Sequence, residues 1–197
     1  FIARSGSGME NLDYAYACQR GIHCLNAPEG NRDSVGEHAL GMLLEMLNHL
    51  VRGDREVRSA LWRREANRGR ELMGKTVAII GYGNTGSALA QRLQGFGVRT
   101  IAYDKYKQGF SDAFVEECSM EEVFAEADVL SLHVPLTEET RYLVNEAYIG
   151  RFARPFWLVN TSRGPVVNTD DLVAALKQGA ILGAALDVLE YEKRSFE

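Results

Sequence analysis

Short apolar runs recur along the chain and are separated by segments in which the apolar residues have helical spacing. The runs predict strands at residues 1–4, 22–26, 75–80, 99–103, 128–134, 156–160 and 181–188. The segments between them predict helices at residues 13–20, 87–96, 145–152 and 171–178. Because strands and helices alternate, we predict an α/β fold with a doubly wound parallel sheet.

A longer helix is expected to begin where Ser34 and Glu37 have the spacing of a capping box. Its apolar residues cover most of its circumference, so the helix must be covered on more than one side. They are Ala39, Leu40, Leu43, Leu44, Met46, Leu47, Leu50 and Val51. Ser119 and Glu122 form a second capping box, which predicts the start of a shorter helix.

A glycine-rich turn follows the strand at residues 75–80. Gly81, Gly83 and Gly86 have the spacing at which a sharp bend, a close approach to a pyrophosphate and tight helix packing each require glycine. Asn84 and Thr85 lie between them, where the first N–H groups of the next helix point at a bound anion. The turn therefore makes the predicted sheet Rossmann-like, with a dinucleotide as its ligand.

Asp104 follows the next strand and lies 18 positions after Gly86. An acidic side chain at this distance accepts hydrogen bonds from an adenosine ribose and repels a 2′-phosphate, so NAD is favoured over NADP. Lys105 and Lys107 come directly afterwards and keep NADP open as an alternative. A tight turn without a ligand, or a site for another adenosine ligand such as a methyl donor, would also explain the glycines.

Composition narrows the possible partners. The 197-residue chain has a net charge of −5, which argues against nucleic acid as the main partner. Cys18, Cys24 and Cys118 are too few and too unevenly spaced for a disulfide framework or a zinc site, so we expect a reducing, cytoplasmic setting and no metal. No apolar run approaches the ~20 residues of a membrane span, and we expect neither a span nor a signal peptide.

Ligands of a doubly wound sheet bind beyond the carboxyl ends of its strands, where several polar residues are expected here. Arg163 follows a strand, so its guanidinium could clamp a substrate carboxylate and polarise the adjacent carbonyl. Thr161 and Ser162 offer hydroxyl and N–H groups to a nicotinamide ribose or a phosphate, and Asp187 could accept from the nicotinamide carboxamide. The alternatives are a surface arginine and polar side chains that only satisfy the loop backbone.

His133 also lies at the ligand end of a strand, directly before Val134 and Pro135. We expect these three residues to face the cofactor mainly through their backbone, and we do not assign His133 as the proton carrier. A packed core histidine is the alternative. The other histidines, His23, His38 and His49, fall inside predicted elements and are expected to be structural.

Near the N-terminus, Ser5, Gly6 and Ser7 form a loop with Gly8 whose backbone N–H groups could bind an anion, although a flexible turn would have the same composition. Further along, residues 52–70 hold seven arginines interleaved with acidic residues and Trp62. This mixture of charges favours a solvated arm or a subunit interface over a nucleic-acid site.

Four motifs, at residues 81–86, 132–137, 160–164 and 185–188, together resemble the D-isomer-specific 2-hydroxyacid dehydrogenases. Residues 4–8 and 26–28 are similar to the D-3-phosphoglycerate dehydrogenase branch of that family. The resemblance extends over essentially the whole chain, in order. It implies an NAD-dependent transfer of a hydride between nicotinamide C4 and C2 of a D-2-hydroxy acid, with a phosphoglycerate- or glycerate-type substrate favoured.

The resemblance also implies catalytic roles. Arg163 would bind the substrate, and Glu192, five residues after Asp187, would orient a catalytic histidine and raise the pKa of its imidazole. Glu190 is the neighbouring candidate, and both glutamates could instead be surface acids. In the family this histidine lies further downstream than Glu197, so we expect the chain to be a fragment without its proton carrier and without turnover of its own.

The same resemblance divides the chain. Residues 1–27 would be the C-terminal remnant of a substrate-binding domain, whose loop at Ser5, Gly6 and Ser7 holds the substrate carboxylate, and residues 28–197 would be the NAD-binding domain. The family implies a homodimer formed through the long helix and the arm around Trp62. A non-enzymatic NAD-sensing module, similar to corepressors on this fold, is the alternative.

Two positions depart from the family pattern. Asn84 and Thr85 stand where His-Ile or Arg-Ile is frequent, which affects the contacts expected to a pyrophosphate but not the turn itself. Lys193 replaces a frequent proline, which affects the expected placement of Glu192.

Overall fold

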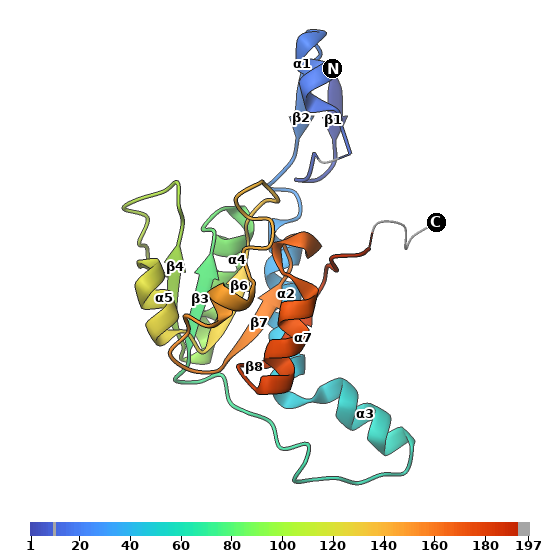
Figure 1. Cartoon of the computed structure of the whole chain (residues 1–197), viewed down its shortest axis with the longest axis vertical. Helices are drawn as coiled ribbons and strands as arrows, with labels where there is room; N and C mark the ends of the chain where they lie inside the picture. The colour runs from blue at the N-terminus through green and yellow to red at the C-terminus, as the bar shows by residue number, and fades with distance from the viewer. Residues whose placement is uncertain (10, 193–197) are drawn as a thin grey trace.

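The computed structural model describes residues 1–9 and 11–192, and its centre is a six-stranded parallel sheet (Figure 1). The strands are β3 (Thr76–Ile80), β4 (Arg99–Tyr103), β5 (Glu116–Glu117), β6 (Val129–Leu132), β7 (Phe156–Asn160) and β8 (Ile181–Leu186). Their order across the sheet is β5-β4-β3-β6-β7-β8. Strands β4 and β5 are therefore added on one side of β3, and β6, β7 and β8 on the other, while all strands stay parallel. This order is that of a doubly wound dinucleotide-binding sheet, and the predicted fold class is confirmed.

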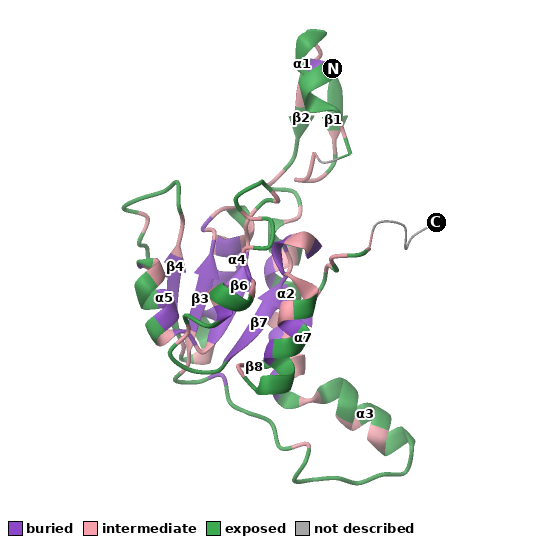
Figure 2. Ribbon diagram, in the orientation of Figure 1, coloured by how far each residue is buried: buried purple, intermediate pink, exposed green. Residues whose placement is uncertain are grey.

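Helices cover both faces of the sheet, so its central strands are buried on both sides. All residues of β6 and β7 are buried (Figure 2), as expected for parallel strands between two helical layers. One face packs against α2 (Arg32–Asn48) and α4 (Asn84–Arg92), which continues as the 3₁₀ helix η1 (Leu93–Phe96). The other face packs against α5 (Met120–Glu126), α6 (Glu146–Ile149) and α7 (Thr169–Gln178).

Helix α2 reaches the sheet beside α4, and the two helices touch closely. A Cβ atom at Gly36 of α2 would lie only 2.9 Å from the carbonyl carbon of Ala88 in α4. Ala39, Leu43 and Leu47 of α2 are buried in the core on this face. The close contact fixes the start of α2 against the helix that follows the glycine-rich turn.

The N-terminal unit stands apart from the sheet (Figure 1). It consists of two parallel strands, β1 (Ile2–Arg4) and β2 (Cys24–Asn26), connected through α1 (Tyr14–Gln19). Its strands carry no buried residue, whereas Ala17 of α1 is buried. Most of this unit is therefore open to solvent apart from a small contact between helix and strands.

One predicted capping box is wrong and the other is confirmed. Helix α2 begins at Arg32 rather than at residue 34, because Asn31 already accepts the first helical hydrogen bond from Val35. The carboxylate of Glu37 turns instead toward Arg92 of α4. At α5 the box is present: Ser119 Oγ accepts from the Glu122 N–H at 3.2 Å, and the Glu122 carboxylate accepts from the Ser119 N–H at 2.7 Å.

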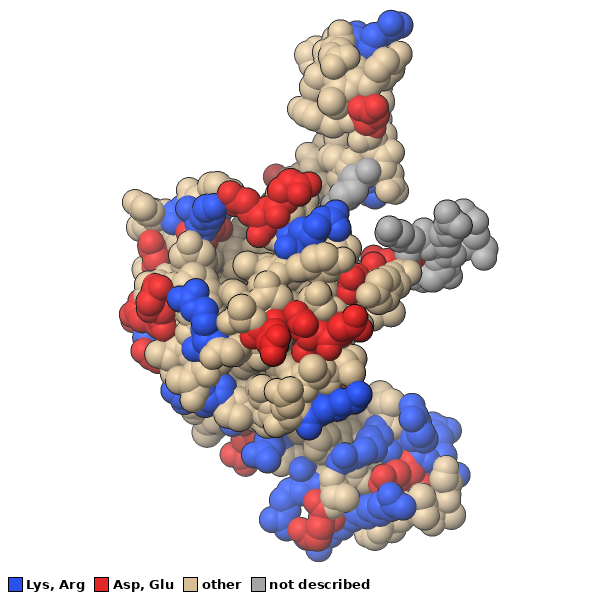
Figure 3. Space-filling view, in the orientation of Figure 1, with Lys and Arg blue, Asp and Glu red and all other residues tan. Residues whose placement is uncertain are grey.

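The long predicted helix is in fact two helices. His49 has a positive φ of 54°, which ends α2 and starts α3 (Leu50–Arg58) in a new direction. No residue of α3 is buried, and Trp62, in the segment that follows, is 82% exposed. Basic side chains gather on this arm at one end of the molecule (Figure 3).

None of the described helices is both long and apolar enough to cross a membrane. Within the same residues, no group of three or more His, Cys, Asp or Glu side chains is arranged to hold a metal ion.

Candidate functional site

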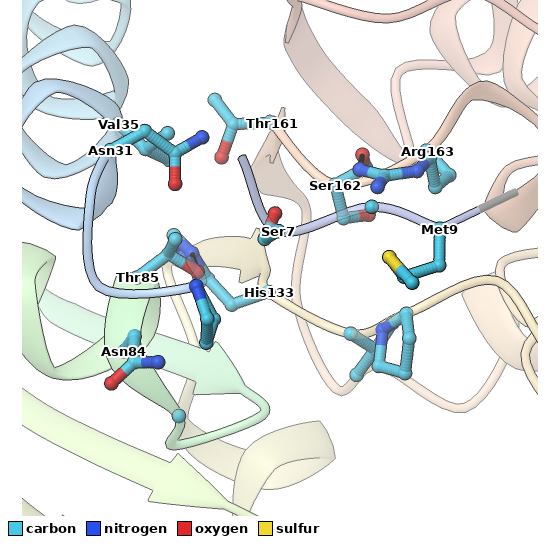
Figure 4. A pocket seen from close by; sticks show the side chains of 15 residues that line it. Ser7, Met9, Asn31, Val35, Asn84, Thr85, His133, Thr161, Ser162 and Arg163 are labelled. Atoms are coloured by element: carbon cyan, nitrogen blue, oxygen red, sulfur yellow. Dashed lines mark hydrogen bonds between the residues drawn. The ribbon is translucent and has the colours of Figure 1, made fainter. Parts of the chain in front are cut away.

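A cavity of about 340 Å³ opens at the carboxyl ends of the central strands, next to the point where the strand order reverses. Three loops of the sheet line it, through residues 83–85, 133–135 and 161–163. Residues 7–9 of the N-terminal unit, Pro28, and Asn31 and Val35 at the start of α2 complete the lining (Figure 4). The cavity thus lies where ligands of doubly wound sheets bind.

The glycine turn has its shape because no side chain fits at two of its glycines. Gly81 has a φ of 93°, and a Cβ atom there would lie 2.6 Å from the carbonyl oxygen of His133. A Cβ atom at Gly86 would lie 2.2 Å from the carbonyl oxygen of Gly81. At Gly83 no atom lies within 4 Å of such a Cβ. The backbone at Gly83 therefore faces open space in the cavity, as close approach by a ligand requires.

His133 connects the end of β6 to this turn. One ring nitrogen, Nδ1, lies 3.1 Å from Thr85 Oγ1, and the other, Nε2, lies 2.9 Å from Ser131 Oγ. Burial lowers the pKa of the imidazole from 6.5 to about 4, because the charged ring would lose its water. A neutral ring held at both nitrogens is poorly suited to carry protons, and it orients Thr85 at the cavity.

The loop after β7 is organised by one buried amide. Asn160 Oδ1 accepts from the Ser162 N–H at 3.0 Å and from Ser162 Oγ at 2.8 Å, while its Nδ2 donates to the Arg163 carbonyl at 3.1 Å. A Cβ atom at Gly164 would lie 1.9 Å from the carbonyl oxygen of Leu189, so this loop is also pressed against the segment after β8. Arg163 Nη1 donates to the Ser162 carbonyl at 2.7 Å, and the side chain lines the cavity (Figure 4).

Two polar atoms of the cavity wall lack partners. Among the described residues, Thr161 Oγ1 and Asn31 Oδ1 are buried without a hydrogen bond, and both side chains line the cavity (Figure 4). An unsatisfied buried polar atom costs about 1–3 kcal/mol, so native structures rarely keep one unless a ligand or water completes it. The hydroxyl and amide groups of a dinucleotide match these two atoms, so the residues present fit NAD.

Asp104 lies beside the glycine turn and outside the cavity lining. Its Oδ2 accepts from the Tyr82 N–H and its Oδ1 from the Tyr106 N–H, both at 2.9 Å. The carboxylate is therefore fixed at the carboxyl end of β4, next to the first two residues of the turn.

The acidic residues after β8 lie outside the cavity lining as well. Asp187 is exposed, and its carboxylate contacts His38 Nε2 of α2 at 3.0 Å. Glu190 accepts from the Tyr142 hydroxyl and from the Thr169 N–H, which fastens it to the start of α7. Glu192 Oε2 accepts from the Leu189 N–H at 2.9 Å. Lys193 lies outside the described residues.

Only part of the predicted N-terminal anion loop reaches the cavity. Ser7 lines it, whereas Ser5 is exposed and Gly6 lies outside the lining. The loop is held by the end of β2 and the residue after it, because Asn26 Nδ2 donates to the Ser7 carbonyl at 2.7 Å and the Ala27 N–H donates to the Gly6 carbonyl at 3.1 Å. Val134 and Pro135 line the cavity together with His133.

Sequence reasoning missed several residues that line the cavity or contact the predicted site. Asn31, Val35, Pro28 and Met9 enter the lining, and His38 contacts Asp187. The one available signal was Asn31 itself, a residue type typical of the position before a helix. The proximity of the other residues depends on how α2 and the N-terminal unit pack, which their local sequence does not indicate.

Residues 40–197 match the family described as D-isomer specific 2-hydroxyacid dehydrogenase, NAD binding domain. The chain is 39% identical to a hydroxypyruvate reductase from Thermotoga maritima, over 97% of this chain and 62% of that protein. It is 36% identical to a D-3-phosphoglycerate dehydrogenase from Bacillus subtilis, over 97% of this chain and 37% of that protein.

Among solved structures, a D-lactate dehydrogenase from Aquifex aeolicus complexed with NAD and lactic acid is similar, with a TM-score of 0.87 and 32% identity. The match covers 98% of this chain and 59% of that one. The chain therefore spans less than two thirds of these relatives. The sequence matches and the shared fold agree, and the chain belongs to the family of D-isomer specific 2-hydroxyacid dehydrogenases, with residues 40–197 matching its NAD binding domain.

Proposed function

We propose that the protein containing this chain is an NAD-dependent oxidoreductase that transfers a hydride between nicotinamide and a D-2-hydroxy acid or its 2-keto acid. The observation that carries the proposal is one cavity in which a glycine turn, two unpartnered polar atoms and the Arg163 side chain meet. When bound, the nicotinamide supplies or accepts the hydride. The chain's own residues bind and orient both molecules.

In this proposal, residues after the carboxyl ends of β3, β6 and β7 would hold the cofactor. The turn at Gly81, Gly83 and Gly86 admits the pyrophosphate, and the N–H groups at Asn84 and Thr85 hold it. Asp104 accepts from the adenosine ribose. The remaining proposed cofactor contacts are His133, Val134, Pro135, Thr161, Ser162 and Asp187. Asp187 lies outside the cavity lining, so its carboxylate is proposed to accept from the carboxamide at the rim of the cavity.

The substrate is proposed to bind through Arg163. A guanidinium fork contacts a carboxylate through two parallel hydrogen bonds and draws electron density from the adjacent carbonyl, which favours hydride arrival at C2. Ser5, Gly6 and Ser7 would hold the same carboxylate from the N-terminal unit, with Ser7 already at the cavity. We propose a small 2-keto acid of the hydroxypyruvate and glycerate type, or a phosphoglycerate, in line with the names of the two relatives.

Glu192 is proposed to orient a catalytic histidine of the full-length protein. A carboxylate next to that imidazole would raise its pKa and hold the protonated form until the proton is delivered. Glu190 is the neighbouring candidate for this role, and its two oxygens accept from the Tyr142 hydroxyl and the Thr169 N–H.

We further propose that residues 1–27 belong to a substrate-binding domain and residues 28–197 to the NAD-binding domain of a cytoplasmic homodimer. The exposed apolar side chains Leu50, Val51, Val57 and Trp62 support pairing through α3 and the arm. Sedimentation of the full-length protein measures this pairing.

The experiment that tests the function uses the full-length protein with NADH and a panel of 2-keto acids. We expect Arg163→Lys to lower kcat/KM by about 100-fold or more while NAD affinity changes little, because an ammonium cannot reproduce a two-pronged contact. Titrations of NAD and of S-adenosylmethionine serve as the binding control. No reduction of any keto acid together with tight NAD binding would favour an NAD-sensing module, and equal loss of NAD binding in Arg163→Lys would refute the role of Arg163.

A further inference from the structure

A group of charged side chains joins two loops on either side of the glycine turn. Lys105 Nζ in the loop after β4 contacts Glu139 Oε1 in the loop after β6 at 2.7 Å. The Tyr106 hydroxyl donates to Glu139 Oε2 at 2.8 Å. Strand β3 lies between β4 and β6 in the sheet, so this contact crosses the carboxyl end of β3, where the turn begins.

The contact between Lys105 and Glu139 contributes little to the stability of the fold. The side chains of Lys105 and Glu139 are 56% and 53% exposed, and ion pairs at such exposure add little to stability because water and salt screen them. Lys105 and Tyr106 lower the pKa of the Glu139 carboxyl and so keep it charged. Both oxygens of the charged Glu139 carboxylate therefore contact residues of the loop that begins with Asp104.

This loop also contains the two cations that would suit a 2′-phosphate. Such a phosphate carries a charge of about −1.5 to −2 and is held in proteins by Lys or Arg donors. Lys107 Nζ is directed to the Tyr82 carbonyl at 2.6 Å, and Lys105 is directed to Glu139. A carbonyl leaves the charge of Lys107 in place, whereas the Glu139 carboxylate compensates that of Lys105.

We propose that Glu139 is a specificity residue that disfavours NADP by holding and neutralising Lys105 beside the adenosine ribose. Asp104 alone repels a 2′-phosphate, but two lysines within the next three residues would offset that repulsion. With Glu139 in place, the four charges of Asp104, Lys105, Lys107 and Glu139 sum to zero, and without it the group gains one positive charge. The inference rests on the proposed function, because it takes Asp104 as the residue that faces the ribose.

The test compares the dissociation constants of NAD and NADP for the full-length protein and its variants. We expect Glu139→Gln to shift the ratio of the two constants toward NADP by about fivefold, the size of one exposed ion contact. Glu138→Gln is the matched control, since it removes the same charge from the neighbouring residue and should shift the ratio by less than about twofold. Lys105→Met combined with Glu139→Gln should return the ratio to that of the wild type.

Three results for the ratio of the NAD and NADP dissociation constants would contradict the role of Glu139. An unchanged ratio in Glu139→Gln, an equal shift in Glu138→Gln, or a shift that survives the removal of Lys105 would overturn the proposal. If Glu139→Gln weakened both cofactors equally, the contact would only fasten the loops, and the proposal would again be wrong. Failure of the wild type to bind NAD at all would instead refute the proposed function, and this inference with it.

Discussion

Two loops face the same cavity and are held in different ways. The turn after β3 is shaped by the absence of side chains, since a Cβ atom at Gly86 would lie 2.2 Å from the Gly81 carbonyl oxygen. The loop after β7 is shaped mainly by a side chain, the buried amide of Asn160, which bonds to Ser162 and to the Arg163 carbonyl. In the turn after β3, a single added methyl group would clash with the backbone. In the loop after β7, a substitution can remove one hydrogen bond and leave the others in place. The two loops should therefore respond differently to mutation.

The largest effect is expected at Gly86. The methyl group of Gly86→Ala would meet backbone rather than a movable side chain, so α4 must shift away from β3, at a cost of about 3 kcal/mol or more of unfolding free energy. The urea midpoint of the full-length protein measures this loss. Gly95→Ala is the matched control, because no atom lies within 4 Å of its Cβ position. Equal midpoints for Gly86→Ala and Gly95→Ala would show that the turn can relax around a side chain.

A smaller loss is expected in the other loop. Asn160→Ala would leave the buried Ser162 N–H without its partner and remove one of the two hydrogen bonds to the Arg163 carbonyl, which also accepts from the Val166 N–H. We expect a cost of about 2–3 kcal/mol. Ser162→Ala removes only one of the three hydrogen bonds and should cost about 1 kcal/mol. Urea midpoints of both variants give the order. If the two substitutions cost the same, the amide would not be the organising group of the loop.

The contrast between the loops also explains what the sequence could predict. The glycine turn was recognisable because its requirements lie within six consecutive residues, and the alternation of apolar runs was sufficient for the doubly wound sheet. The capping box at Ser34 and Glu37 was misleading because Glu37 is drawn to Arg92, a residue far along the chain. The end of α2 at His49 was not predictable, because neither glycine nor proline stands at this position.

Other features depend on tertiary packing and were out of reach. Strand β5 consists of Glu116 and Glu117, has no apolar pattern, and is strand only because it pairs with β4. Asn31 enters the cavity because α2 is fixed against α4 at Gly36, a contact between distant segments. The roles assigned to Arg163 and to the cofactor contacts stay predictions, since geometry brings residues together without showing what they bind.

At neutral pH the smallest effect is expected from the titration of His133, which joins the glycine turn to β6. Its pKa in the folded protein is about 4, below the ordinary 6.5, so the unfolded chain binds more protons between these values. The free energy of unfolding should therefore rise as the pH increases from about 4 to 6.5, and fall again when the pH is lowered through this range. His133→Gln, which keeps polar groups near Thr85 and Ser131 but does not titrate, should flatten the dependence of the urea midpoint on pH in that range. Above about pH 6.5 the two curves should run parallel; an unchanged slope below it would mean that the imidazole becomes charged without leaving its place between the two hydroxyls.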